Sequence, residues 1–510
     1  MKIEELKETL SDVLPAADLD ADFLFTELDS LGIATILVVL GKKYDILLGG
    51  EDVTPKNFKN LASIAKMVDE KMSLESKIRQ HALQTPDKTA AICGEESISY
   101  SQLWDAIEAK AAQLEAEGLK ERHAYVYRAN QGIDFLITYC AVHYLKAVAV
   151  PLGHLETEEN FQAIKKEVEG YDFPEGVTDT LYTTGTTGKS KGVMLSETCL
   201  RSCAENFIVD LHFHRDLLFI ISGPLNHIAS LFKIHPTLSA GGTLCILDGL
   251  KDMNAFFKVF DLPFEHFGTF LVPASIRLIM QFSYEKLCSL ADKIDFIETG
   301  AAPITRADME QLSRALPHSH LYNTYGGTEI GCVATYDFND GKYMEGCIGR
   351  PLKNADVEIT PEGTVVVSGL TIMSGYLGDE ESTNKVIVDG KVYMSDLGYF
   401  DENGLIHLTG RAGDVINVGG YKVNPLDVEN AAAAFPGIRD SICIAANHPV
   451  IGPVLKLLVV SDRPLDKHEL AVHLKSKLEG YKVPTMYEAV ESIHYTYNGK
   501  KDRKFYKESE

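Results

Sequence analysis

The first 72 residues carry apolar side chains at the three- and four-residue spacing of amphipathic helices. One run predicts a helix at the start, a second predicts a helix that begins at Asp29-Ser30, and a third predicts a last helix after a short element near residues 55–58. The apolar positions of these runs are Ile3, Leu6, Leu10 and Val13; Leu31, Ala34, Leu37 and Val38; and Leu61, Ile64, Ala65 and Val68. We therefore predict a small four-helix unit over residues 1–72.

From Ser73 onward the pattern changes to short apolar strands that alternate with helices. Strand-like runs at 90–93, 97–100, 125–127 and 148–152 are separated by helical segments. This alternation continues to about residue 360 and is typical of a layered α/β fold. The stretch 364–408 is rich in strands. After Gly410-Arg411, a last unit combines strand-like runs at 415–418, 441–445 and 455–460 with two predicted helices.

A chain of 510 residues is too long for a single core. We expect an α/β multidomain protein with a four-helix bundle at residues 1–72, a large layered α/β domain with a β-rich subdomain at 73–410, and a small, mobile α+β domain at 411–510.

Composition narrows the classes of partner. The formal charge of −24 argues against a nucleic-acid or anionic membrane surface as the main partner. The nine cysteines lack CxxC spacing, which argues against a structural zinc site and a disulfide framework. The N-terminus reads as a charged helix and not as a signal peptide, and no apolar run approaches the roughly 18 residues of a membrane span. We expect a cytoplasmic protein.

The strongest chemical signal is Tyr182-Thr-Thr-Gly-Thr-Thr-Gly-Lys-Ser-Lys-Gly192. Glycines let the backbone approach phosphate oxygens, hydroxyl and backbone N–H groups donate to them, and lysines supply positive charge. The nucleotide-binding P-loop does not fit, because its first glycine would fall at Thr183. We predict a phosphate-binding loop; the alternative is a polar surface turn.

Three further motifs suit the rest of a nucleotide site. Tyr322-Asn-Thr-Tyr-Gly-Gly-Thr-Glu-Ile-Gly331 offers an aromatic wall and a carboxylate, Glu329, that could bind Mg²⁺. Asp396 could accept from two ribose hydroxyls, with Arg411 reinforcing the contact. Near the C-terminus, Asn498-Gly-Lys500 could bring a lysine into a site from a separate small domain. The alternative for residues 322–331 is an ordinary hairpin, and that for the C-terminal motif is a basic tail. Asp396 could instead cap a turn, and Arg411 could be a surface charge.

In their order and spacing these motifs resemble the adenylate-forming superfamily, which includes acyl-CoA synthetases, aryl-acid ligases and peptide-synthetase adenylation domains. The resemblance covers roughly residues 75–505 and includes Gly300-Ala-Ala-Pro303 as an adenine-lining segment. It implies that a carboxylate and ATP form an acyl-AMP and pyrophosphate, after which a thiol takes the acyl group and AMP leaves. The stretch between Pro151 and Leu181 is shorter than the family pattern.

The resemblance also implies residue roles. The matched positions are Thr183, Thr184, Gly185, Thr186, Thr187, Gly188 and Lys191 for the phosphates; Ala301, Ala302 and Tyr325 for adenine; Asp396 and Arg411 for ribose; Lys500, Thr328 and Glu329 for catalysis, with Mg²⁺ on Glu329; His227, Gly326 and Gly327 for the acyl pocket; and Gly413 for the hinge of the small domain. His227 stands where enzymes for α-amino acids carry Asp, which favours an aryl or fatty acid.

Residues 1–72 resemble an acyl or peptidyl carrier domain, with Leu28-Asp-Ser-Leu31 similar to the attachment site of phosphopantetheine. The resemblance implies that a phosphopantetheinyl transferase modifies Ser30, and a helix N-terminus is a favourable place for a phosphodiester. The alternatives are that Asp29 and Ser30 only cap a helix, or that the unit is a degenerate docking module.

We expect an AMP-forming acid–thiol ligase that uses ATP and Mg²⁺ and transfers the acyl group to a carrier-bound phosphopantetheine thiol. Since few residues connect Val68 to Leu74, the carrier has little room to travel. An acyl-CoA synthetase that uses free CoA, with the carrier serving a later step, is therefore the first alternative. A non-catalytic nucleotide-binding scaffold that presents a carrier is the second; Glu329, Asp396 and Lys500 argue against it.

Overall fold

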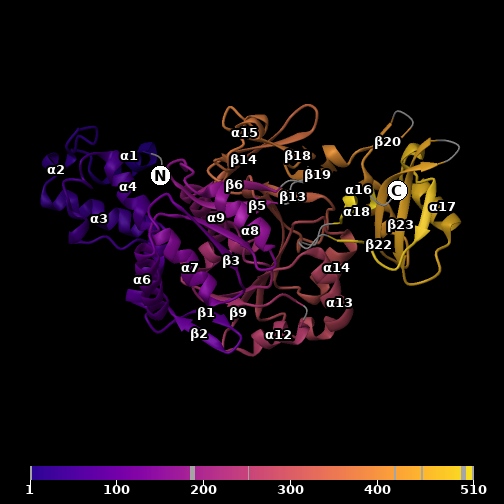
Figure 1. Cartoon of the computed structure of the whole chain (residues 1–510), viewed down its shortest axis with the longest axis horizontal. Helices are drawn as coiled ribbons and strands as arrows, with labels where there is room; N and C mark the ends of the chain where they lie inside the picture. Colours follow the sequence, from indigo (N-terminus) through magenta and orange to yellow (C-terminus); the bar gives the residue numbers. More distant parts are fainter. Residues whose placement is uncertain are drawn as a thin grey trace.

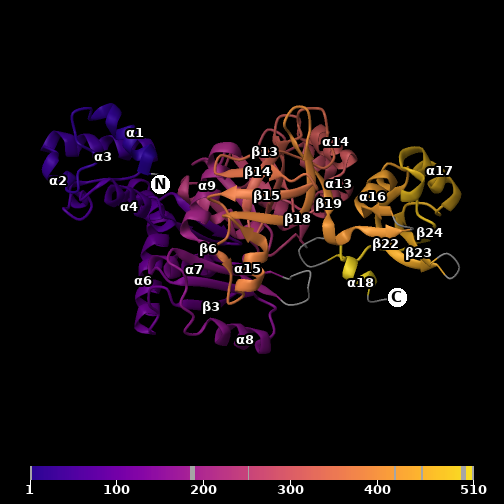
Figure 2. The same ribbon diagram turned by 90° about the horizontal axis from the view of Figure 1, so that it is seen from above.

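The computed structural model describes residues 3–183, 190–250, 252–418, 421–448, 452–495 and 501–507. Its helices and strands form three units along the long axis of the molecule (Figure 1). A helical N-terminal unit lies at one end, a small C-terminal unit lies at the other, and a large α/β domain lies between them in both views (Figure 2).

The N-terminal unit has its own core. Its helices are α1 (Ile3–Val13), α2 (Leu24–Glu27), α3 (Ser30–Tyr44) and α4 (Leu61–Lys71). The side chain of Asp29 accepts a hydrogen bond from the backbone N–H of Gly32 at 2.7 Å and caps α3, and Asn60 caps α4 in the same way. The buried apolar cluster of this unit is drawn only from residues 6–68.

Two features of this unit differ from the prediction. Leu31 and Val38 of α3 are exposed, because the helix buries its other face through Ile36 and Leu40. The element expected near residues 55–58 is a turn, in which the N–H of Phe58 donates to the carbonyl of Thr54 and the Asn57 side chain donates to the carbonyl of Asp52 at 2.9 Å. These local polar contacts compete with helix formation. The additional helix is α2, whose four residues are too few for an amphipathic pattern to be recognised.

Two β-sheets form the framework of the large domain. The larger sheet has fourteen strands in the order β14-β15-β18-β19-β13-β12-β11-β10-β9-β7-β8-β1-β2, with β17 paired to β18, and the strands from β11 to β8 run parallel. Its strands are β1 (Thr89–Cys93), β2 (Glu96–Ser99), β7 (Leu217–Ile221), β8 (Thr243–Ile246), β9 (His266–Phe270), β10 (Ile294–Thr299), β11 (His320–Gly327), β12 (Gly331–Asp337), β13 (Cys347–Pro351), β14 (Ala355–Ile359), β15 (Thr364–Gly369), β17 (Ile387–Val388), β18 (Lys391–Phe400) and β19 (Ile406–Arg411).

The smaller sheet has the order β16-β6-β5-β4-β3. Its strands are β3 (Ala124–Ala129), β4 (Val148–Gly153), β5 (Val177–Thr183), β6 (Lys191–Ser196) and β16 (Gly375–Tyr376). A single helix, α8 (Glu158–Val168), lies between β4 and β5 in the chain, in the stretch that is short in sequence. β16 comes from the β-rich part of the domain, so this pairing ties segments almost two hundred residues apart.

Helices join the two sheets into one core. A single buried cluster contains side chains from both sheets and from α6 (Tyr100–Ala116), α7 (Ile133–Tyr144), α9 (Glu197–Asp210) and α11 (Ile234–Ser239), which is the layered arrangement predicted from the alternating pattern. The other helices of the domain are α5 (Leu74–Gln84), α10 (Ile228–Leu231), α12 (Met253–Lys258), α13 (Pro273–Cys288), α14 (Arg306–Ala315) and α15 (Glu380–Val386).

The C-terminal unit is an α+β structure. Its elements are β20 (Ile416–Val418), β21 (Tyr421–Val423), α16 (Pro425–Ala433), β22 (Ile438–His448), β23 (Gly452–Ser461), α17 (Lys467–Lys477), β24 (Met486–Ala489) and α18 (Arg503–Lys507). Its two apolar clusters are drawn only from residues 416–506. Because each unit has a separate core, we propose domain boundaries near residues 72 and 410. Within the described residues, no helix combines the length and apolar composition needed to cross a bilayer.

A buried polar cluster lies beside the start of α5. Nε2 of His143 is 2.9 Å from Asp179, and Nδ1 is 3.5 Å from Glu75. The hydroxyl of Tyr139 contacts Nε2 of His235 at 2.8 Å. Burial by itself lowers the pKa of His143, but the charge and hydrogen bond of Asp179, followed by those of Glu75, raise this pKa to about 10. His143 is therefore protonated at neutral pH and forms a buried ion pair.

This ion pair predicts a loss of stability at alkaline pH. A group whose pKa is raised in the folded state contributes its full stabilisation below its unfolded pKa, near 6.5 for His143, and loses it as the pH rises through about 10. Urea unfolding between pH 6.5 and 10 should show a decline in the free energy of unfolding of the large domain. His143→Gln should remove that part of the decline, whereas the exposed control His123→Gln should retain it. Equal pH slopes in all three proteins would contradict the assignment.

Candidate active site

A cavity of about 410 Å³ lies where the two sheets and the β-rich strands of the large domain meet. Phe270 and Ala301 border it at the carboxyl ends of the parallel strands β9 and β10, the edge at which α/β sheets bind ligands. Ten of the predicted site residues line it: Thr183, Lys191, His227, Ala301, Gly326, Gly327, Thr328, Glu329, Asp396 and Arg411. Segments more than two hundred residues apart in sequence are thus brought to one cavity.

One buried carboxylate, Asp396 on β18, joins three strands at the cavity wall. Its Oδ2 accepts a hydrogen bond from the hydroxyl of Tyr325 on β11, and its Oδ1 accepts one from Nε of Arg411 on β19, both at 2.9 Å. Burial and then the charge of Asp396 raise the pKa of Tyr325 well above its ordinary value, so this hydroxyl stays protonated and donates. A carboxylate has about four acceptor positions, which leaves capacity for the hydroxyls of a ligand.

A second carboxylate, Glu329, is presented by the connection between β11 and β12. This turn needs glycine: a Cβ on Gly326 would lie 2.3 Å from the carbonyl oxygen of Gly331, which itself has a φ of +67°. The hydroxyl of Tyr376 on β16 donates to Oε1 of Glu329 at 3.3 Å and orients it at the cavity. The half-buried carboxylate keeps oxygen lone pairs of the kind that Mg²⁺ prefers, so Glu329 fits this metal.

The two ends of the predicted phosphate loop face each other on neighbouring strands, where Thr183 of β5 pairs with Lys191 of β6. The Ser190 hydroxyl donates to the carbonyl of Thr183 at 2.8 Å, and the Lys191 ammonium donates to Oγ of Ser382 at 2.7 Å. Lys191 also lies 4.6 Å from the centre of the Tyr376 ring, which connects the loop to the strand that orients Glu329. The predicted phosphate ligands Thr184, Gly185, Thr186, Thr187 and Gly188 lie outside the described residues.

The remaining predictions for the large domain fall partly on the cavity. Ala301 lines it with a φ of +64°, a left-handed conformation that is strained for a residue with a side chain and is often found at functional sites. Ala302 and Tyr325, both predicted to border adenine, are not among the described residues that line it. His227 lines it and caps α10, with Nδ1 accepting from the N–H of Ala229 at 3.3 Å.

Lys500 lies outside the described residues, but the residues on either side of it are held on the C-terminal unit. The hydroxyl of Tyr495 donates to Asp440 at 2.6 Å. Lys501 and Arg503 form ion pairs with Glu429 of α16 at 3.1 and 2.8 Å. The described residues on both sides of positions 496–500 are therefore held on the smaller unit.

Two predicted sites lie away from the cavity wall. Gly413 lies in a short 3₁₀ turn (Ala412–Asp414) directly after Arg411 and β19. Ser30 is exposed at the N-terminal end of α3, in the unit at the far end of the molecule from the C-terminal unit (Figures 1 and 2).

Sequence reasoning missed a buried ion pair on the cavity wall. Nζ of Lys233 lies 2.7 Å from Oε2 and 2.8 Å from Oε1 of Glu298, and the two side chains are only 3% and 2% exposed. The hydroxyl of Thr324 donates to Oε1 of Glu298 at 2.9 Å. The available signal was a charge of opposite sign inside each of two apolar runs: Lys233 in Ile228–Leu238, and Glu298, which follows Asp295, in Ile294–Thr299.

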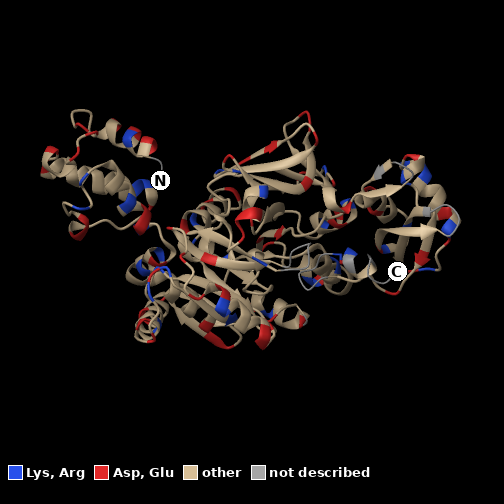
Figure 3. Ribbon diagram, turned by 45° about the horizontal axis from the view of Figure 1, so that its top comes forward, with Lys and Arg blue, Asp and Glu red and all other residues tan. Residues whose placement is uncertain are grey.

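The charges at the cavity differ in arrangement from those of the surface. Acidic and basic residues are interspersed over all three units (Figure 3). At the cavity wall, Lys191, Lys233 and Arg411 lie together with Glu298, Glu329 and Asp396. Local cations of this kind can attract an anionic ligand despite the overall charge of −24.

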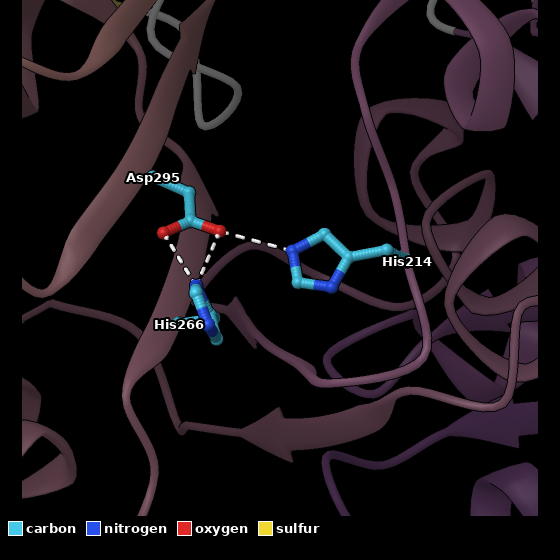
Figure 4. A group of neighbouring side chains, drawn as sticks. All are labelled: His214, His266 and Asp295. Atoms are coloured by element: carbon cyan, nitrogen blue, oxygen red, sulfur yellow. Dashed lines mark hydrogen bonds and ion pairs between the residues drawn. The ribbon is translucent and has the colours of Figure 1, made fainter.

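A histidine cluster on the opposite edge of the sheet has the side chains of a metal site. His214, His266 and Asp295 lie near the amino ends of β7, β9 and β10, and the two imidazoles contact the carboxylate at 3.0 Å (Figure 4). The N–H of Asp216 donates to Nδ1 of His214 at 3.3 Å, which places the imidazole proton on Nε2, the atom that faces Asp295. Hydrogen bonds therefore account for this cluster, and Glu329 remains the candidate metal ligand.

Comparison with known families gives matches in the large domain and the C-terminal unit. The model described as "AMP-binding enzyme" matches residues 78–169 and 175–377, which is more than half of the chain. The model described as "AMP-binding enzyme C-terminal domain" matches residues 427–500. These matches contain most of the motifs on which the predicted resemblance rests.

Individual relatives support the same fold. The chain is 27% identical to a 2-succinylbenzoate–CoA ligase of Staphylococcus epidermidis over 352 residues, which is 67% of this chain and 72% of the relative. ATP-bound MatB from Rhodopseudomonas palustris superposes with a TM-score of 0.77 at 23% identity, covering 86% of this chain and 98% of MatB. O-succinylbenzoate coenzyme A synthetase from Bacillus subtilis, in complex with ATP and magnesium ion, gives 0.72 at 21% identity, covering 84% and 98%.

Asp396→Asn should weaken ATP binding more than Tyr325→Phe. The asparagine leaves Arg411 without its counter-charge and weakens the acceptor for ribose hydroxyls, whereas the phenylalanine removes one hydrogen bond worth about 1 kcal/mol. Calorimetric titration should show a dissociation constant raised on the order of 100-fold for Asp396→Asn and up to about tenfold for Tyr325→Phe. The exposed control Asp356→Asn should bind ATP as the wild type does. Unchanged affinity in Asp396→Asn would rule out its role at the nucleotide.

Proposed function

Because this chain belongs to the AMP-binding enzyme family and is an AMP-forming acid–thiol ligase, we propose that it activates a carboxylic acid with ATP and transfers the acyl group to coenzyme A. The observation that carries this proposal is the convergence of Thr183, Glu329, Asp396 and Arg411 on one cavity. Asp396 and Arg411 pair across the neighbouring strands β18 and β19, but Thr183 and Glu329 come from distant parts of the chain, so local sequence constraints do not explain why all four meet.

In the first half-reaction, a carboxylate oxygen attacks the α-phosphorus of ATP, the bond to the bridging oxygen breaks, and pyrophosphate leaves. Asp396, which accepts a hydrogen bond from the hydroxyl of Tyr325, and Arg411 hold the ribose, and the backbone at Ala301 borders the adenine. Thr183 and Lys191 contact the phosphates from the two ends of the loop. Glu329, with Thr328 beside it, would hold the Mg²⁺, which would supply positive charge to the phosphate oxygens.

The two reacting groups are both anions, so positive charge between them lowers the barrier. We assign this role to Lys500, delivered by the C-terminal unit. In the second half-reaction the thiol sulfur, having lost its proton, attacks the acyl carbonyl carbon and AMP leaves. The small unit would turn about Gly413 between the two steps. Among the described residues, no atom lies within 4 Å of where a Cβ on Gly413 would be, so packing does not require glycine there and its backbone freedom suits a hinge.

Free CoA is a better acceptor than a carrier thiol for this proposal. The sequence favoured the carrier, yet the similar proteins are named CoA ligases or coenzyme A synthetases, which supports the alternative reading. Nothing in the family matches supports the carrier reading of residues 1–72, since those matches begin at residue 78. Ser30 therefore remains a proposed attachment site for phosphopantetheine, serving a later step or another protein.

The acid is proposed to lack an α-amino group. A buried or half-buried carboxylate would be needed to pair with an ammonium group, and His227 occupies the expected position. His227 is held as the cap of α10, with Gly326 and Gly327 on the neighbouring wall. An aryl or aliphatic acid fits this wall better than an α-amino acid.

Lys500→Ala should abolish adenylation and largely spare thioester formation from supplied acyl-AMP. The lysine acts on charge that develops in the first half-reaction only, and loss of one such donor lowers the rate on the order of 100- to 1,000-fold. Pyrophosphate release and acyl-CoA formation should be measured separately. Lys467→Ala, which removes an exposed lysine from the same unit, is the matched control. Equal loss of both half-reactions would contradict the assignment; retention of both would favour a different lysine.

Ser30→Ala separates the two acceptors. If CoA accepts the acyl group, the variant should form acyl-CoA at the wild-type rate, because Ser30 lies outside the cavity. Mass spectrometry of wild type treated with a phosphopantetheinyl transferase and CoA tests the modification itself. Acyl transfer that requires modified Ser30 and is absent with free CoA would restore the carrier-thiol reading.

A further inference from the structure

We propose that the Lys233–Glu298 pair selects an acid whose far end carries a neutral hydrogen-bonding group, such as a hydroxyl or a carbonyl. This inference rests on the proposed function and names the class of acid that the cavity takes. The pair borders a part of the cavity with aromatic and small side chains, which are Phe207, Phe232, Phe270, Ala229 and Cys332. It comes from two segments, α10–α11 and β10, that meet only in the fold.

The burial of this pair is the first argument. Both side chains are almost fully removed from solvent and carry opposite full charges. An ion pair of this kind gains little over well-packed apolar residues, because desolvation opposes the attraction between the charges. Stability alone therefore does not account for two complementary charges on a cavity wall, whereas recognition of a polar group in the cavity does.

The unused hydrogen-bonding capacity of the pair is the second argument. The Lys233 ammonium has three donors, of which one engages Oε1 of Glu298, and it lies 3.5 Å from the centre of the Phe207 ring. Oε2 of Glu298 is close to Nζ but lacks the geometry of a hydrogen bond, and it has no other hydrogen-bond partner among the described residues. The pair thus keeps unused donors and one buried, unpartnered acceptor at the wall of the cavity.

The net charge of the pair decides which polar group fits. A second carboxylate on the acid would be attracted by Lys233 but repelled by Glu298, whose oxygens lie within 3 Å of the same ammonium. A plain alkyl tail would cover the remaining donors and acceptor and leave them unsatisfied. A hydroxyl can accept from Lys233 and donate to Glu298, and a carbonyl can accept from Lys233. A neutral polar group is therefore preferred over both an anion and a hydrocarbon.

The test is a competition among acids of matched shape. Pyrophosphate release is measured for benzoates with a para hydroxyl, methyl or carboxylate group, and for short alkanoates with the same three terminal groups. In whichever of the two series reacts faster, we expect kcat/KM for the hydroxyl acid to exceed that for the methyl and carboxylate acids by at least about 100-fold. A site that hydrogen-bonds a hydroxyl rejects an analogue that leaves the polar groups of the site unpaired. This wild-type measurement decides the proposal without any variant.

A double variant then assigns the preference to the pair. Lys233→Met/Glu298→Leu removes both charges together, so neither charge is left buried without its partner. This double variant should prefer the methyl acid over the hydroxyl acid, and its KM for ATP should be unchanged. The control Lys391→Met/Glu358→Leu makes the same changes at a solvent-exposed ion pair and should keep the wild-type preference. Should the double variant fail to fold, Thr324→Val removes only the hydroxyl that donates to Glu298 and should reduce the ratio several-fold.

The outcomes are distinguishable. This inference is overturned if the methyl or carboxylate acid releases pyrophosphate at a rate equal to or above that of the hydroxyl acid. The proposed function would still stand in that case. A double variant that keeps the wild-type ratio would also overturn it. If no carboxylic acid of any class supports release, the proposed function fails and the inference fails with it.

Discussion

The site depends on one buried carboxylate that holds three strands at a fixed distance. Asp396 accepts from Tyr325 and Arg411, whose strands β11 and β19 belong to the central and the β-rich parts of the same sheet. A buried carboxylate without partners would be costly, and these two contacts give Asp396 two hydrogen-bond donors, one of them cationic. The same contacts fix where a bound ribose would lie and where the chain leaves the large domain for the small one, since Arg411 is its last strand residue.

A second set of contacts divides the cavity into regions of different character. Tyr376 connects Glu329 to Lys191 through the edge strand β16, which places cationic and anionic groups where phosphates would lie. Lys233 and Glu298 form a pair without net charge beside aromatic side chains. The charged region suits a nucleotide and a metal, and the neutral polar region suits the acid. Lys501 and Arg503, which follow Lys500, are paired with Glu429 of the small unit, which supports our proposal that this unit delivers the lysine.

Local patterns in the sequence predicted much of this fold. Asp29 marks the start of α3, the spacing of apolar residues marks α4, and alternation of strands and helices predicts the layered domain; the resemblance to the adenylate-forming superfamily is confirmed by the family matches. The sequence did not reveal α2, because four residues are too few to show a helical repeat of apolar positions. It also did not reveal the left-handed backbone conformation of Ala301. It also missed Lys233 with Glu298. Each reads alone as a charge in an apolar run, and only the fold brings Nζ of Lys233 to 2.7 Å from the carboxylate of Glu298.

The central claim is that an oxygen of the acid attacks the α-phosphorus of ATP in this cavity. Turnover of an acid labelled with ¹⁸O in both carboxylate oxygens tests it directly, with mass spectrometry of the nucleotide product. The account predicts that AMP carries one ¹⁸O atom for each thioester formed, since the attacking oxygen stays on phosphorus when the thiol displaces AMP. Unlabelled AMP, or ADP with the label in inorganic phosphate, would contradict it.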